Sequence, residues 1–144
     1  MNKTEQTNIE KPMKKILIVE DDQNIARAEA IRLKHAGYEV SVAPDALTGV
    51  EVALKNPPDL VLLDISLPAG DGFTVAERIQ TLIPRATPVI FITASKQPGL
   101  RERAKELGAA AFFHKPYEAD DLLGAVQLAL VPPSAVEEWG VYAI

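Results

Sequence analysis

The stretch that decides the fold is ILIVEDDQN, residues 16–24, in which four aliphatic residues run straight into three consecutive carboxylates. A continuous run of aliphatic residues is typical of a β-strand covered on both faces, as strands are in a parallel sheet. Adjacent carboxylates repel one another, so their position at the end of a core strand needs a reason. The stretch therefore predicts a buried strand and marks its end as a candidate site.

Further runs of β type follow along the chain, at residues 38–43, 60–63, 89–93 and 110–114. They alternate with segments of helical length, at residues 25–36, 45–55, 72–83, 100–107 and 118–130. Elements that alternate at this spacing require right-handed crossovers, which produce a parallel sheet with helices on both faces. The sequence thus predicts an α/β fold built from five βα units.

The composition is that of a globular protein of one domain. The chain has 144 residues, of which 47% are hydrophobic and 24% charged, and its formal net charge is −5. This charge does not favour general binding to nucleic acid, and no apolar run approaches the roughly 20 residues that span a bilayer. We therefore expect a cytoplasmic protein with no direct nucleic-acid or membrane partner. Residues 1–14 are expected to form a flexible arm, residues 15–130 the domain, and residues 131–144 a tail or a truncated linker.

The ends of the predicted strands carry the candidate chemistry. In an open parallel sheet, ligands bind outside the carboxyl ends of the strands. There the sequence places Glu20 and Asp21, then Asp64, Thr93 and Lys115. Clustered carboxylates favour a hard divalent cation with oxygen ligands such as Mg²⁺. Asp64 is then a candidate nucleophile towards phosphorus, and Thr93 and Lys115 are suited to the phosphoryl oxygens.

Four motifs in order carry a family resemblance: ILIVEDD, LVLLDISLPAGDG, FITAS and FFHKPY. With these motifs, residues 15–130 resemble the response-regulator receiver domain of two-component signalling, in the CheY-like superfamily. The resemblance implies a doubly wound, flavodoxin-like (βα)5 fold whose five parallel strands are ordered 2-1-3-4-5. It also implies a phosphorylation-dependent switch that assists its own phosphorylation and dephosphorylation and is not a conventional enzyme.

The resemblance assigns the phosphoryl and metal chemistry to specific positions. Asp64 would accept the phosphoryl group from a histidine kinase or a histidine phosphotransfer protein of a phosphorelay. Mg²⁺, or Mn²⁺ in its place, would be held by Asp21, Asp64 and the backbone carbonyl of Ser66. Glu20 would contribute directly or through a water molecule.

The resemblance also implies the residues of the switch. Thr93 and Lys115 would bind the phosphoryl oxygens, and Thr93 would move towards the phosphate on activation. The aromatic residue three positions before the lysine, which is Phe112, would turn inward at the same time. Phe112 and Phe113 are expected to point to opposite sides of their strand, because successive side chains alternate.

Some of the charged residues near these motifs are expected to be structural. Asp22 is interpreted as the acid at the start of the helix at residues 25–36. The apolar period of that helix is weak, since Arg27, Glu29 and Arg32 interrupt it. Asp71, with the glycine that follows it, is expected to form a turn and to cap the next helix.

The output of the switch has several interpretations. A stand-alone receiver would act by binding itself or an unidentified output protein through the surface of residues 100–130. Alternatively, the chain is a receiver module truncated from a larger DNA-binding regulator or hybrid kinase. A phosphatase with an aspartyl nucleophile is the third interpretation. Such enzymes of the haloacid-dehalogenase type need a second acid two residues after the nucleophile, where this chain has Ser66.

Overall fold

The sheet of this protein has five parallel strands in the order β2-β1-β3-β4-β5. The structure is a computed structural model, and it describes residues 12–131. The strands are β1 (Lys15–Val19), β2 (Glu39–Ala43), β3 (Leu60–Asp64), β4 (Val89–Thr93) and β5 (Ala111–His114). The helices are α2 (Gln23–His35), α3 (Ala46–Lys55), α4 (Gly72–Leu82), α5 (Leu100–Glu106) and α6 (Ala119–Ala129). The predicted fold and strand order are confirmed.

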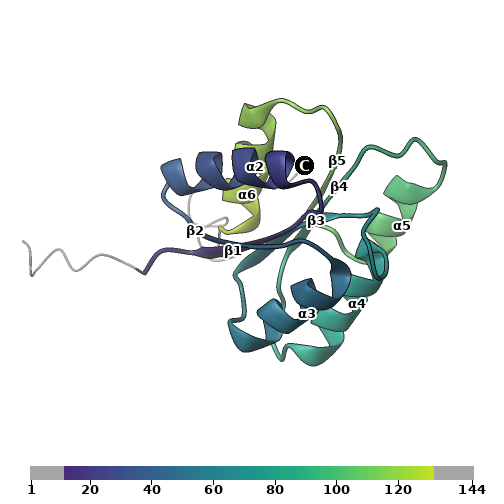
Figure 1. The fold of residues 1–144 in the computed structure, drawn as a ribbon, viewed down its shortest axis with the longest axis horizontal. Coiled ribbons are helices and arrows are strands. Elements are labelled where there is room, and N and C mark those ends of the chain that lie inside the picture. Colours follow the sequence, from purple (N-terminus) through teal and green to yellow (C-terminus); the bar gives the residue numbers. More distant parts are fainter. Residues whose placement is uncertain (1–11, 132–144) are drawn as a thin grey trace, which may run out of the picture.

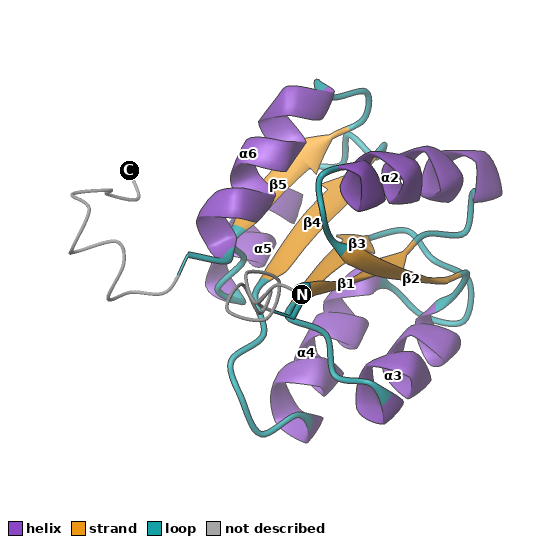
Figure 2. Ribbon diagram, turned by 90° about the vertical axis from the view of Figure 1, so that its left-hand side faces the viewer, coloured by secondary structure: helices purple, strands orange, loops and turns teal. Residues whose placement is uncertain are grey.

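The helices cover both faces of the sheet (Figures 1 and 2). On one face, α2 and α6 pack against Ile16 and Ile18 of β1, and on the other α3, α4 and α5 pack against Leu17 and Val19. All four of these β1 side chains are at most 1% exposed. A strand with both faces buried needs a continuous apolar run, which explains the composition of residues 16–19.

Aspartates begin three of the helices, so short-range chemistry fixes where the chain leaves the sheet. The side chain of Asp22 accepts hydrogen bonds from the backbone N–H groups of Asn24 and Ile25. Asp45 and Asp71 cap α3 and α4 in the same way. Such caps satisfy N–H groups that have no partner inside the helix. The structural interpretations of Asp22 and Asp71 are therefore confirmed.

The predicted bounds of the elements differ from the observed ones by one or two residues. The clearest difference is in α2, which begins at Gln23 and not at residue 25, because the cap at Asp22 starts the helix before its first apolar residue. Residues 1–11 of the predicted arm and residues 132–144 of the predicted tail lie outside the described part of the chain. Among residues 12–131, no helix is long and apolar enough to cross a membrane.

Candidate functional site

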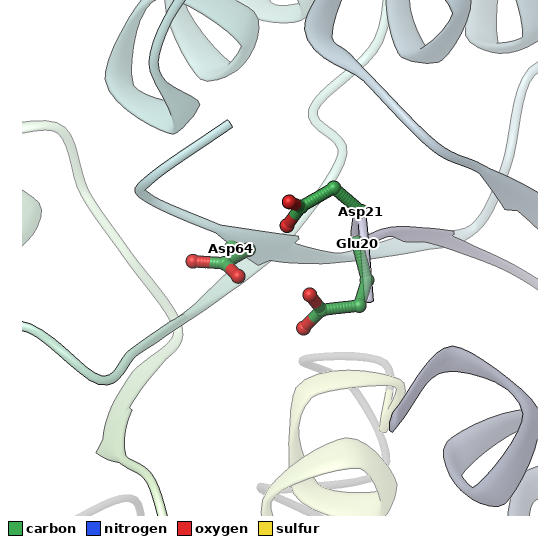
Figure 3. Close-up of side chains that lie close together, drawn as sticks. All are labelled: Glu20, Asp21 and Asp64. Atoms are coloured by element: carbon green, nitrogen blue, oxygen red, sulfur yellow. The ribbon is translucent and has the colours of Figure 1, made fainter. Parts of the chain in front are cut away.

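Three carboxylates lie together at the carboxyl edge of the sheet (Figure 3). Glu20 and Asp21 follow β1, and Asp64 is the last residue of the neighbouring strand β3. One oxygen from each carboxylate lies within 4.8 Å of the other two. Glu20 and Asp64 are buried, with 4% and 6% of their surface exposed, and Asp21 is exposed. The prediction that these acids converge is confirmed.

Lys115, which directly follows the edge strand β5, contacts both buried acids. Its Nζ donates to Oε1 of Glu20 at 2.7 Å and to Oδ2 of Asp64 at 2.9 Å. Its side chain is only 15% exposed, so both ion pairs lie in a partly dehydrated environment. Burial by itself would lower the pKa of Lys115, but the hydrogen bonds and charges of Glu20 and Asp64 raise it above its ordinary value.

The pKa of Glu20 is strongly raised in this site. Burial raises its pKa to about 7, against the lowering effect of its hydrogen bonds with Lys115 and with the backbone of Asp22. The negative charge of Asp64 adds to the increase but is a smaller cause. Dehydration of the buried Glu20 carboxylate therefore raises its pKa more than repulsion within the acidic cluster does.

Backbone N–H groups fix the orientation of the two buried carboxylates. Oδ1 of Asp64 accepts from the N–H of Ser66 at 3.0 Å, and Oε2 of Glu20 accepts from the N–H of Asp22 at 3.0 Å. Asp22 was interpreted as a cap alone, and its side chain does cap α2. Its backbone also contributes to the site, which no feature of its side chain could indicate.

Gly72 brings the start of α4 against the strand end that carries Asp64. Its N–H donates to the carbonyl oxygen of Ile65 at 2.8 Å. A Cβ at this position would lie 2.3 Å from the carbonyl oxygen of Asp64. Only a residue without a side chain permits this approach. The sequence interpretation of Gly72 as a turn residue missed its contact with the backbone of Asp64.

The two residues expected to form the switch occupy neighbouring strands. Thr93 ends β4 and is fully buried, and its Oγ1 accepts from the N–H of Ser95 at 2.9 Å. Phe112 is half-buried on β5, where the guanidinium of Arg101 lies 4.6 Å from its ring centroid. Phe112 packs with the α3–α5 side of the sheet and Phe113 with the α2–α6 side, which confirms their predicted alternation.

The carboxylate cluster fits a divalent cation. Opposite ligands of an octahedral Mg²⁺ lie about 4.2 Å apart, since each is about 2.1 Å from the metal. Adjacent ligands lie only about 3.0 Å apart, so the oxygens of Glu20, Asp21 and Asp64, which are within 4.8 Å of one another, would draw closer together around a bound ion. An open groove lined by Asp21 and Ser66 lies beside the cluster. The donors are all hard oxygens, which Mg²⁺ and Mn²⁺ prefer.

Comparison with known proteins agrees with this fold and this site. Residues 16–127 match the family described as "Response regulator receiver domain". The chain is 37% identical to response regulator ArlR of Staphylococcus saprophyticus over 118 residues, which are 82% of this chain and 53% of that protein. It is 38% identical to transcriptional regulatory protein PdtaR of Mycobacterium tuberculosis over 118 residues, 81% of this chain and 57% of that protein. The chain thus spans about half the length of the curated relatives that it matches.

A solved structure gives the same result. The CheY-like response regulator receiver domain protein from Methanospirillum hungatei superposes with a TM-score of 0.79 at 30% identity. The match covers 88% of this chain and 99% of that one. The chain belongs to the response regulator receiver domain family, and so it is a receiver domain of two-component signalling. Members of this family receive phosphoryl groups from histidine kinases and typically bind Mg²⁺ at an acidic pocket.

Proposed function

We propose that Asp64 is the phosphoacceptor of this receiver domain and that Lys115 and the acids of β1 support the transfer. The observation that carries the proposal is the arrangement around Asp64. This buried carboxylate contacts one ammonium group at 2.9 Å and lies beside two further carboxylates. Phosphoryl transfer requires positioning and charge neutralisation more than an acid–base pair. This site offers one ammonium group and a set of carboxylates that would hold a neutralising divalent cation.

In the proposed reaction, a carboxylate oxygen of Asp64 attacks the phosphorus of a phosphohistidine on a kinase or phosphotransfer protein. The new O–P bond forms as the P–N bond breaks, and the electron pair of that bond leaves with the imidazole, which is then protonated. Lys115 is placed to interact with the phosphoryl oxygens, because its Nζ already lies against Asp64. The buried Thr93 at the end of β4 is the proposed hydroxyl donor to the same oxygens.

Glu20, Asp21 and Asp64, with the backbone carbonyl of Ser66, are the proposed ligands of Mg²⁺. When bound, the cation neutralises charge that develops on the phosphoryl oxygens. Glu20 must be deprotonated to bind the cation, and its pKa of about 7 means that this deprotonation occurs close to neutral pH. The N–H groups of Ser66 and Asp22 keep the carboxylates of Asp64 and Glu20 oriented while the charge around them changes.

The proposed switch couples this site to the face formed by α5 and β5. Thr93 is paired with His114 in the β4–β5 register, and Phe112 lies on the same strand two residues earlier. An inward turn of Phe112 would break its cation–π contact with Arg101. The output partner would then bind the surface of residues 100–130, as a second copy of the chain or as another protein in the cytoplasm.

A place within a longer regulator is a second candidate arrangement for the same domain. The observation behind it is that the curated relatives include transcriptional regulatory proteins about half covered by this chain. In that arrangement residues 15–130 are the receiver domain, and the change at residues 100–130 is transmitted within one polypeptide.

Labelling by a small phosphodonor tests the proposed phosphoacceptor. The protein is incubated with acetyl phosphate, with and without Mg²⁺, and the mass of the intact chain is followed. We expect one Mg²⁺-dependent phosphoryl group on the wild type and none on Asp64→Asn. Asp45→Asn is a matched control, because asparagine caps a helix as well as aspartate and the fold of α3 is retained. Equal labelling of Asp64→Asn and the wild type would exclude Asp64.

A further inference from the structure

Glu29 is a buried acid that the proposed phosphoryl transfer does not use. It lies on the inner face of α2 beside Ala26, Ala30 and Leu33, and only 5% of its surface is exposed. Burial raises the pKa of this carboxyl group above its ordinary value. A polar group in such a place is costly unless it has a hydrogen-bond partner. The interruption of the helical period at Glu29 therefore points to a specific partner.

That partner is Tyr117, which lies 88 positions further along the chain. The phenol hydroxyl of Tyr117 donates to Oε2 of Glu29. Burial, together with the neighbouring acid, raises the pKa of this phenol, so the proton stays on the tyrosine. The ring of Tyr117 also packs against Phe113 of β5, with centroids 5.7 Å apart. These contacts tie the segment that follows β5 to helix α2.

Lys115 lies on the short segment between β5 and Tyr117, whose hydrogen bond to Glu29 joins this segment to α2. On one side its backbone N–H donates to the carbonyl oxygen of Thr93 at 2.8 Å. On the other side only Pro116 separates it from Tyr117. An open groove lined by Glu29, Lys115 and Tyr117 runs along this segment. Without the hydroxyl of Tyr117, the segment loses the hydrogen bond that anchors it to α2.

The position of the Lys115 backbone matters because one ammonium group must reach two carboxylates at once. A lysine side chain has four rotatable carbons, and here it must present Nζ to Glu20 and Asp64 at 2.7 and 2.9 Å at once. Both distances lie within the normal hydrogen-bond range, and a displacement of the Lys115 backbone away from the two acids would lengthen them. Geometry of this kind depends on support from a second layer of contacts.

We propose that Glu29 and Tyr117 are positioning residues, whose hydrogen bond holds the segment after β5 so that Lys115 contacts Glu20 and Asp64 together. This inference rests on the proposed function, since it assigns Lys115 a part in phosphoryl transfer to Asp64. Neither Glu29 nor Tyr117 contacts the phosphoryl group. They act through the backbone of the residue that does.

The first test measures the labelling rate with acetyl phosphate and Mg²⁺. Loss of one buried hydrogen bond should slow Tyr117→Phe by about three- to tenfold. Tyr38→Phe is the matched control, because Tyr38 is half-buried against the same α2–α6 cluster but lies beyond the far end of α2. Glu29→Leu should slow labelling as Tyr117→Phe does. Glu29→Gln retains an acceptor oxygen and should recover most of the lost rate.

The second test observes Lys115 directly, with no phosphodonor present. An ammonium group held in lasting hydrogen bonds exchanges its protons slowly and gives an NζH₃⁺ signal in ¹H–¹⁵N spectra, which Lys115→Arg assigns. We expect this signal in the wild type and in Tyr38→Phe, and its loss or broadening in Tyr117→Phe and Glu29→Leu. Urea unfolding shows that each variant is folded at the temperature used.

The outcomes separate this inference from the proposed function. If Tyr117→Phe and Glu29→Leu label at the wild-type rate and keep the Lys115 signal, the positioning role is wrong. The same conclusion holds if Glu29→Gln behaves like Glu29→Leu. If the wild type is not labelled at all, the proposed function fails. The Lys115 signal still reports whether the hydrogen bond between Tyr117 and Glu29 holds the ammonium group in place.

Discussion

Replacement of Gly72 by alanine tests how closely α4 must approach the strand that carries Asp64. The new Cβ would lie 2.3 Å from the carbonyl oxygen of Asp64 and 2.9 Å from Cα of Ile65, whereas ordinary contact begins near 3.4 Å. Both neighbours are backbone atoms, so relief requires the helix start or the strand end to move by about 1 Å. Overpacking of this kind costs about 1–3 kcal/mol, and the better helix propensity of alanine returns less than about 1 kcal/mol. We expect a net loss of about 2 kcal/mol in the free energy of unfolding.

Urea unfolding measures this loss, with Gly124→Ala as the matched control. Gly124 also lies in a helix, α6, and a Cβ there meets no heavy atom within 4 Å. Its replacement should raise the free energy of unfolding by about 0.5–1 kcal/mol. The displaced strand end should also make Gly72→Ala slower than Gly124→Ala in labelling by acetyl phosphate. A Gly72→Ala variant as stable as the wild type, with an unchanged labelling rate, would refute the reasoning.

Three further predictions concern the acids and the switch. Asp21→Ala should abolish the stimulation of labelling by Mg²⁺. Asp22→Ala should retain this stimulation but lose about 1 kcal/mol of stability, because the cap of α2 is removed. The reverse pattern in Mg²⁺ titrations would show that Asp22 and not Asp21 supports metal binding. The affinity for Mg²⁺ should rise by up to about tenfold per pH unit until the pH passes the Glu20 pKa of about 7, because the cation binds the deprotonated carboxylate. Calorimetry at several pH values measures this affinity. An affinity that does not change with pH would contradict the prediction. Arg101→Ala should favour the inward position of Phe112 by about 0.5–1 kcal/mol, because the cation–π contact that holds the ring is lost. The NMR chemical shifts of the Phe112 ring report the populations of its two positions. Populations equal to those of the wild type would exclude a role for the cation–π contact.

The fold and the centre of the site were predictable because they depend on patterns that are local in sequence. The run at residues 16–19 is apolar throughout because both of its faces are buried. Once the strands were recognised as parallel, their carboxyl ends had to share one edge of the sheet. This rule predicts that Glu20, Asp64 and Lys115 lie together, and the distances of 2.7 and 2.9 Å agree with it.

The features that sequence reasoning missed depend on a partner distant in the chain or on the backbone. Glu29 interrupts the period of α2 as a solvent-exposed charge would, and its burial is explained only by Tyr117, 88 positions away. Gly72 is indistinguishable in sequence from a turn glycine, since the atom that excludes a side chain is the carbonyl oxygen of Asp64. Hydrophobic periodicity indicates which face is buried, but it does not identify what lies against that face.

The charges of the site support the proposal that a divalent cation and a phosphoryl group bind there together. Three carboxylates and one ammonium group leave two negative charges in excess when all are ionised, and a divalent cation neutralises them. A phosphoryl group on Asp64, the proposed acceptor, would then add further negative charge where the ammonium of Lys115 already lies, 2.9 Å from the Asp64 carboxylate. Without the cation, the phosphoryl group would face the negative charges of Glu20 and Asp21, and only the positive charge of Lys115 would oppose them. Electrostatic repulsion would then oppose the transfer. On this reasoning Mg²⁺ binds before the phosphodonor reacts. Labelling rates should therefore saturate with Mg²⁺ at a concentration set by its affinity for the unphosphorylated site.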